Sequence, residues 1–191
     1  MARLASDAYQ AMGAGDGAAS DFKLQKDDPL VPAVEADDAE TVRERLRVTG
    51  ETPLAVGGFF AACRDRKYSL IRAFLDAGIS PLASTENKYG SGCASICVFA
   101  YYAFIRDPDH ADEYFEIFER MLDHGASGRY GGGGLYYSGP GAGGYYVTYS
   151  FSVFDIARDM IERGDGDGER MLRLLRAHEK APENGESAPT S

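Results

Sequence analysis

Apolar residues recur at helical spacing along the chain, with polar residues between them. Within residues 68–78 the apolar positions are Tyr68, Leu70, Ile71, Phe74 and Leu75, and the stretch ends at a glycine. This spacing predicts an amphipathic helix with a glycine at its C-terminal end. The same pattern predicts further helices over residues 40–46, 114–122 and 169–175, which end near Gly50, Gly125 and His178. Recurrence of one helix four times indicates a repeat protein.

A second recurring sequence motif precedes three of these predicted helices. It reads TPLAVG over residues 52–57, SICVFA over residues 95–100 and SVFDIA over residues 152–157. In each copy a hydroxyl side chain can cap the start of a helix, and a small residue lets a second helix approach closely. Each repeat unit is therefore expected to hold two helices.

The three copies of this motif resemble the T-P-L-H-x-A opening of the inner helix in ankyrin repeats, and residues 61–81 resemble the outer-helix part of the same repeat. The resemblance implies an all-α, ankyrin-like stack of about four helix-turn-helix repeats, the first of them partial. It also implies an extended concave binding surface, because stacked repeats project their loops along one edge.

Residues 127–149 (SGRYGGGGLYYSGPGAGGYYVTY) interrupt the helical pattern between the third and fourth repeats. Two tyrosine-rich arms flank a glycine-rich centre, which predicts a β-hairpin-like insertion with a loose tip. Tyrosine offers a large contact area and glycine offers adaptability, as in binding loops. We expect partner contacts from Arg129, Tyr130, Tyr136, Tyr137, Tyr145 and Tyr146. The alternative is that some of these rings pack on the stack and that the glycines form a disordered insertion.

Composition divides the chain into three parts. Residues 1–31 form an N-terminal segment that is expected to be partly flexible, because residues 11–19 are mostly Gly and Ala. Residues 32–178 form the ankyrin-like domain. Residues 179–191 are rich in Pro, Glu and Ser and are expected to be a disordered tail.

Charge narrows the range of partners. The chain has 30 Asp plus Glu against 20 Lys plus Arg, a net charge of −10, which disfavours direct binding to nucleic acid. The third repeat is especially acidic, and Asp109, Asp112 and Glu116 are expected to meet a protein with a basic surface. The alternative is that this strip is the solvated face of an amphipathic helix.

The sequence gives little support for catalysis. Residues 139–144 satisfy G-x-G-x-x-G, but a tyrosine-rich segment follows them instead of a helix that could hold a pyrophosphate. Cys93 and Cys97 are spaced for one face of a helix, and we interpret them as core rather than as metal ligands. His124 and His178 fall at helix ends, where a cation is favoured. We therefore expect no enzyme activity, no cofactor and no metal.

The first ten residues lack the apolar run of a signal peptide or membrane anchor, and the three cysteines fit a reducing compartment, so we expect a cytoplasmic protein without membrane contact. The Ala, Gly, Arg and Asp bias suggests a bacterial or phage-like origin. The expected function is non-enzymatic protein binding, for example by an inhibitor or immunity protein that blocks a toxin or a nucleic-acid-handling protein. Alternatives are a small-ligand protein or enzyme with the glycine-rich insertion as a lid, and a substrate adaptor. The oligomeric state stays open.

Overall fold

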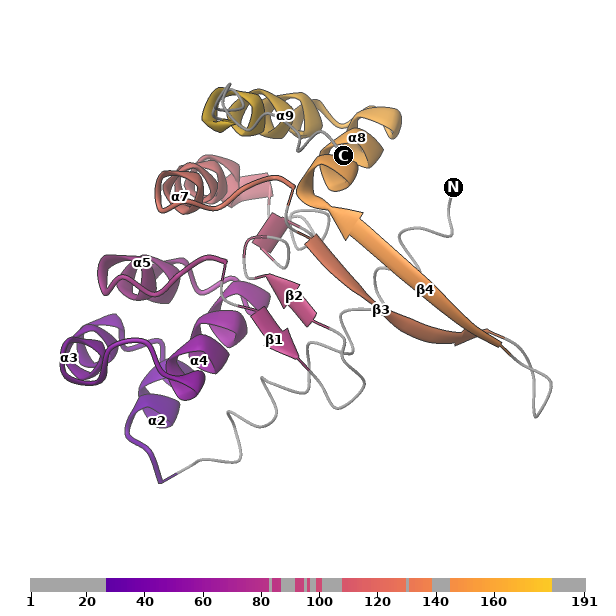
Figure 1. The fold of residues 1–191 in the computed structure, drawn as a ribbon. Helices are drawn as coiled ribbons and strands as arrows, with labels where there is room; N and C mark the ends of the chain where they lie inside the picture. The colour runs from indigo at the N-terminus through magenta and orange to yellow at the C-terminus, as the bar shows by residue number, and fades with distance from the viewer. Residues whose placement is uncertain are drawn as a thin grey trace, which may run out of the picture.

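The structure is a computed structural model, and its helices and strands are shown in Figure 1. It describes residues 27–82, 84–86, 92–94, 96, 99–100, 108–129, 131–138 and 145–179. Seven α-helices with defined ends lie within these residues. The helices predicted from the periodicity are confirmed. They are α2 (Leu30–Glu35), α3 (Ala39–Thr49), α4 (Pro53–Arg64), α5 (Tyr68–Asp76), α7 (Ala111–Asp123), α8 (Val153–Glu162) and α9 (Gly166–His178). A short 3-10 helix, η1 (Pro108–His110), precedes α7.

Side-chain caps define where several helices begin. The hydroxyl of Thr52 accepts a hydrogen bond from the backbone N–H of Ala55 at the start of α4. At the start of α8, Ser152 and Asp155 each accept a hydrogen bond from the other's backbone N–H, which forms a capping box. Asp165 caps α9. These residues satisfy backbone donors that the first turn of a helix leaves unpaired.

Four helices are followed by glycines with a left-handed backbone: the three predicted stops, and Gly164 after α8 with φ 77°. Gly50 follows α3 with φ 64°, Gly78 closes the turn after α5 with φ 80°, and Gly125 follows α7 with φ 91°. Residues with a Cβ rarely adopt these angles, whereas glycine does so without steric cost. The predicted glycine stops are therefore explained by backbone conformation.

The helices form two layers (Figure 1). Helices α3, α5, α7 and α9 follow one another in one layer, and each contacts the next. The other layer contains α2, α4 and α8, which pack on α3, α5 and α9 respectively. Ile96, Phe99 and Ala100 are also helical and buried, and they precede η1 and α7 in the chain. The expected N-terminal boundary, between residues 31 and 32, falls inside α2.

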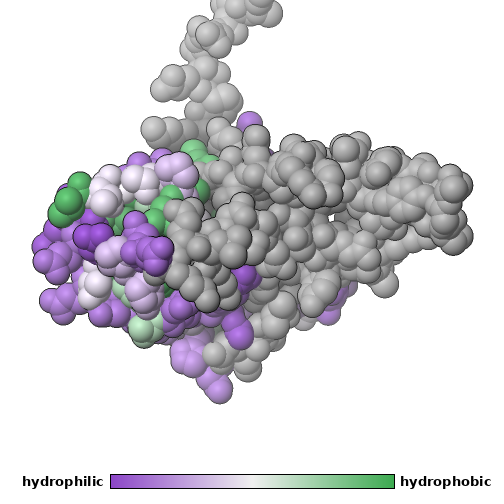
Figure 2. Space-filling view, turned by 90° about the horizontal axis from the view of Figure 1, so that it is seen from below, coloured by the Kyte–Doolittle hydropathy of each residue, from purple (hydrophilic) through white to green (hydrophobic). Residues whose placement is uncertain are grey.

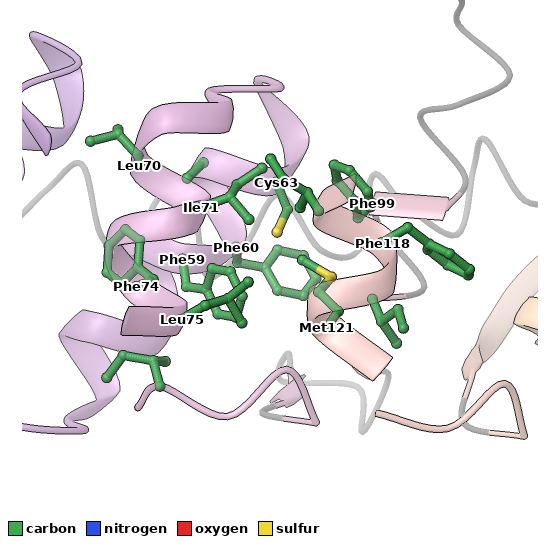
Figure 3. Packing of buried hydrophobic residues seen from close by; sticks show 14 of the residues in the cluster. Phe59, Phe60, Cys63, Leu70, Ile71, Phe74, Leu75, Phe99, Phe118 and Met121 are labelled. Atoms are coloured by element: carbon green, nitrogen blue, oxygen red, sulfur yellow. The ribbon is translucent and has the colours of Figure 1, made fainter. Parts of the chain in front are cut away.

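The core lies between the two layers (Figure 3). Phe59 of α4 stacks on Phe74 of α5 with ring centroids 5.5 Å apart. Phe99 stacks on Tyr114 of α7 at 4.4 Å, and Tyr114 stacks in turn on Phe118 at 6.1 Å. Burial of such a side chain contributes about 1.5–3 kcal/mol, so these rings contribute substantially to the core, together with its aliphatic residues.

Four strands form one antiparallel sheet in the order β1-β2-β3-β4. The strands are β1 (Ser84–Glu86), β2 (Gly92–Ala94), β3 (Gly131–Ser138) and β4 (Tyr145–Ser152). The first two lie in the chain after α5, and the last two lie between α7 and α8 (Figure 1). Helix periodicity alone did not predict β1 and β2, because each strand has only three residues.

One sequence interpretation is wrong. Cys93 was expected on a helix beside Cys97, but Cys93 lies in β2, opposite Thr85 of β1. Cys97 lies outside the described residues. The spacing of four therefore does not place the two cysteines on one helical face, since that argument requires both to be helical. Cys63, the other cysteine, is buried in α4.

Candidate functional site

The tyrosines singled out from the sequence occupy two paired strands. Tyr136 lies opposite Val147, and Tyr137 lies opposite Tyr146. Tyr145, at the start of β4, lies opposite Ser138. Tyr136, Tyr137, Tyr145 and Tyr146 are therefore brought together at the end of the strand pair remote from α8. Tyr130 and residues 139–144 lie outside the described residues.

The base of this strand pair is fixed on the last two helices. Gly128 is buried, and a Cβ at this position would lie 2.7 Å from side-chain atoms of both Phe154 in α8 and Leu175 in α9. The backbone N–H of Phe154 also donates a hydrogen bond to the carbonyl oxygen of Gly128 at 3.3 Å. Only a residue without a side chain fits here unless neighbouring groups shift, so the chain enters β3 in close contact with the helices.

Arg129, the first predicted contact residue, lies at the same base. Its side chain is 74% exposed, and its Nε donates to the Glu179 carboxylate at 2.8 Å. An exposed ion pair of this kind contributes little to stability. The guanidinium is accessible for another carboxylate, and exchange of partners would cost little.

The acidic residues predicted to bind a partner lie at the start of α7 and immediately before it. Asp109 is exposed in η1. Asp112 is also exposed and accepts a hydrogen bond from Arg170 of α9 at 2.8 Å. The Arg170 guanidinium also lies 4.2 Å from the centre of the Phe115 ring, which adds a cation–π contact between α9 and α7.

Glu116 belongs to a chain of ion pairs that we call the ionic ladder. Arg72 of α5 donates to Glu116 through Nε at 3.1 Å and to Glu113 through Nη1 at 2.8 Å. The hydrogen bond from Arg72 lowers the pKa of the Glu116 carboxyl, although partial burial opposes this shift. The ladder continues from Glu116 through Arg120 and Asp76 to Arg43 of α3.

The ionic ladder joins three consecutive helices of one layer, α3, α5 and α7. Its groups are partly exposed, so salt screens them and the individual pairs are weak. The sequence did not reveal this role, because Arg72 and Glu116 are 44 residues apart. The available local signal was the pair of charged residues, Arg72 and Asp76, on a largely apolar helix. Glu116 and Asp112 thus have intramolecular partners, and their contact with a second protein stays a prediction.

His178 makes the corresponding link from α9 to α7. Its Nδ1 lies 2.9 Å from the carbonyl oxygen of Leu174, and its Nε2 lies 3.1 Å from a carboxylate oxygen of Asp123. The contact with the Leu174 carbonyl, aided by Asp123, raises the pKa of the His178 imidazole despite partial burial. Both ring nitrogens donate when the imidazole is protonated, so the charged form holds both contacts.

An open cavity of about 390 Å³ lies among α2, the end of α3 and the start of α4. Sequence reasoning did not identify it, because its walls come from three helices and the turns between them. The residues that line the cavity are both polar and apolar: Asp28, Leu30, Arg45, Thr49, Thr52, Pro53 and Leu54.

The described surface, seen from below, is mostly hydrophilic and carries separate apolar spots (Figure 2).

The described residues show neither a metal cluster nor a membrane helix. In that part of the chain, no three His, Cys, Asp or Glu side chains are grouped as metal ligands. Likewise, no described helix has the length and apolar content needed to cross a bilayer. Comparison of the chain with protein-family models, curated proteins and solved structures finds no match.

Proposed function

We propose that the chain is a non-enzymatic protein-binding module, built as an ankyrin-like stack whose insertion at residues 127–149 makes the main contacts. The observation that carries the proposal is the pair of strands β3 and β4, which brings tyrosines 136, 137, 145 and 146 to one end. Tyrosine and glycine together give a large, adaptable contact area at low entropic cost.

The arrangement of the helices supports a stack. Pairs α2–α3, α4–α5 and α8–α9 each consist of helices in contact, and helices of one layer contact their successors. The left-handed glycines Gly50, Gly78 and Gly125 fall after three of the four helices in that layer. Gly78 and Gly125 close the same turn one residue past the C-caps of α5 and α7. Recurrence of one turn at equivalent places is what a repeated helix pair requires.

The position of the strands supports their role as a contact surface. β3 and β4 lie between α7 and α8, where a repeat stack carries its connecting loops, and the pair extends away from the helices (Figure 1). Its base is fixed by Gly128 against α8 and α9. A contact surface held on rigid elements loses less conformational entropy on binding than a free loop does.

Charge points to the class of partner. A net charge of −10 favours a protein with a basic surface and raises its rate of encounter. Asp109 is the predicted acidic contact that is exposed and has no ion pair among the described residues. A basic toxin or nucleic-acid-handling protein would fit this class, and in that case the chain acts as an inhibitor or immunity protein.

The experiment is capture of the partner from the native host, compared with capture by a variant that lacks residues 131–144. The thermal unfolding of both proteins serves as the control for folding. We expect the wild-type chain to retain a specific basic protein and the deletion variant to lose it. Retention with unchanged affinity would show that the insertion is not the contact surface.

Two further measurements separate the alternatives. An inhibitor abolishes the activity of the captured protein, whereas a substrate adaptor leaves that activity intact. A small-ligand protein or enzyme that uses the insertion as a lid would instead show a rise in melting temperature with nucleotides or other metabolites. Such a rise, without a captured protein, would contradict the proposal.

A further inference from the structure

The outer edge of β4 has features that native sheets normally avoid. In the strand order β1-β2-β3-β4, β4 has one neighbour, so within the described residues no strand pairs with the backbone N–H and C=O groups of its other edge (Figure 1). The opposite edge of the sheet is β1, which has only three residues, whereas β4 has eight. The long edge is therefore on β4.

The sequence of β4 lacks the usual protection of such an edge. Exposed edges are commonly blocked by charged residues, by proline, by bulges or by short length. The strand reads YYVTYSFS and contains no charged residue, no proline and no glycine. Its pairing with β3 proceeds one to one from Gly131–Ser152 to Ser138–Tyr145, so the described register contains no bulge. Most of its residues have high β-propensity.

We propose that the outer edge of β4 pairs with the β4 of a second copy of this chain, in antiparallel orientation, and forms a two-fold symmetric dimer. The pairing does not require the protein-binding function proposed above. With the two-fold axis at Thr148, Val147 lies opposite Tyr149 of the second copy, and Tyr145 lies opposite Phe151. Aromatic and β-branched residues in opposite positions stabilise a sheet, and Thr148 would face its own copy.

The same geometry explains why association stops at two chains. An isologous contact uses the same edge on both copies, so dimer formation consumes the long edge and leaves only the three-residue edge of β1 on each side. Because β4 contains no charged residue, the pairing of two β4 strands places no acidic side chains of the two copies opposite each other. A single strand pair is a small interface, so the dissociation constant is expected to be on the order of micromolar.

The test uses charge at the symmetry axis, in the full-length chain. The molar mass of the wild type, measured by light scattering over a range of concentrations, is expected to rise from monomer to dimer. Thr148→Lys places two like charges opposite each other and is expected to weaken the dimer at least about tenfold, as is Thr148→Glu. Ser138→Lys, on β3, is the matched control and is expected to leave the dimer unchanged.

Mixing the two charged variants locates the axis. If Thr148 faces its own copy, Thr148→Lys and Thr148→Glu form a heterodimer although neither forms a homodimer. Hydrogen exchange of the wild type adds a readout that needs no variant, since amides of residues 145–152 are expected to exchange more slowly as concentration rises. A wild type that stays monomeric up to about 500 µM, or a dimer insensitive to both charges, would overturn the proposal. So would failure of the mixture to associate.

Discussion

At the scale of single residues, close approach between helices depends on positions that have no room for a side chain. Gly168 of α9 is the sharpest case, because a Cβ there would lie 2.7 Å from Cβ of Met160 and 2.8 Å from the carbonyl oxygen of Ala157. Both contacts are with α8, and backbone atoms cannot move aside as a flexible side chain can. Gly168 therefore sets the distance between α8 and α9.

Gly168→Ala is expected to destabilise the fold by about 1–3 kcal/mol, because the added methyl group forces the two helices apart. Gly166→Ala is the matched control on the same helix, since a Cβ at Gly166 meets nothing within 4 Å. Alanine is a better helix former, so this control should equal or slightly exceed the wild type. Urea unfolding of the three proteins measures the difference, and equal stabilities would contradict the packing described here.

His178 gives a pH dependence whose direction follows from its contacts. Its pKa is higher in the folded chain than the ordinary 6.5, so the protonated form is the stabilising one. The contribution is fully present below pH 6.5 and is lost as pH rises through the higher pKa of the folded state. In unfolding experiments between about pH 6 and pH 8.5, the stability difference between wild type and His178→Gln should shrink as pH rises. A difference that is constant or grows with pH would exclude this role.

At the scale of elements, the start of α8 couples the sheet to the helices. Ser152 is the last residue of β4 and also the cap of α8, where its hydroxyl accepts from the backbone N–H of Asp155 at 3.2 Å. Asp155 in turn accepts from the backbone N–H of Ser152 at 2.8 Å. The capping box therefore holds the junction where the strand pair joins the last helix pair.

Ser152→Ala is expected to cost about 0.5–2 kcal/mol, because it removes the acceptor for the first turn of α8. Thr52→Ala should have a similar effect on α4, since Thr52 makes the same bond. Thr49→Ala is the control: its exposed hydroxyl donates to the carbonyl oxygen of Arg45 within the same helix and caps nothing. Thermal unfolding distinguishes the three, and a Ser152→Ala protein as stable as Thr49→Ala would contradict the assignment.

The ionic ladder is tested by a double-mutant cycle between Arg72 and Glu116. The two groups are partly exposed, so we expect a coupling energy of about 0.5–1 kcal/mol between Arg72→Met and Glu116→Gln. The coupling should decrease at high salt, because counterions screen exposed charges. Chemical unfolding of the four proteins at low and high salt gives both values. A coupling energy of zero at low salt would show that Arg72 does not hold Glu116, and Glu116 would then be available to a partner.

Sequence patterns predicted the elements better than the contacts between them. The glycine stops and the Thr52 and Ser152 caps located helices because both are local signals within one turn. The three-residue strands β1 and β2 carry too few residues for a period, which is why Cys93 was assigned to a helix. Cross-helix pairs such as Arg120 with Asp76 depend on distant segments and leave no local pattern.

At the scale of the whole molecule, two layers of helices hold a sheet whose last strand pair carries the tyrosines. The layers supply the buried core, and Gly128 fixes the strand pair on α8 and α9. In the proposed function, the net charge of −10 acts over longer distances and guides encounter with a basic partner. In the proposed function, affinity then comes from the tyrosines, whereas the helices supply rigidity.

The most direct test measures partner affinity for two variants in which tyrosines 136, 137, 145 and 146 are all replaced. Replacement by serine removes the ring area and is expected to weaken binding at least about a hundredfold, whereas replacement by phenylalanine keeps the rings and should preserve most of the affinity. Isothermal titration calorimetry with the captured partner gives both dissociation constants. Equal affinity of the serine variant and the wild type would contradict the account.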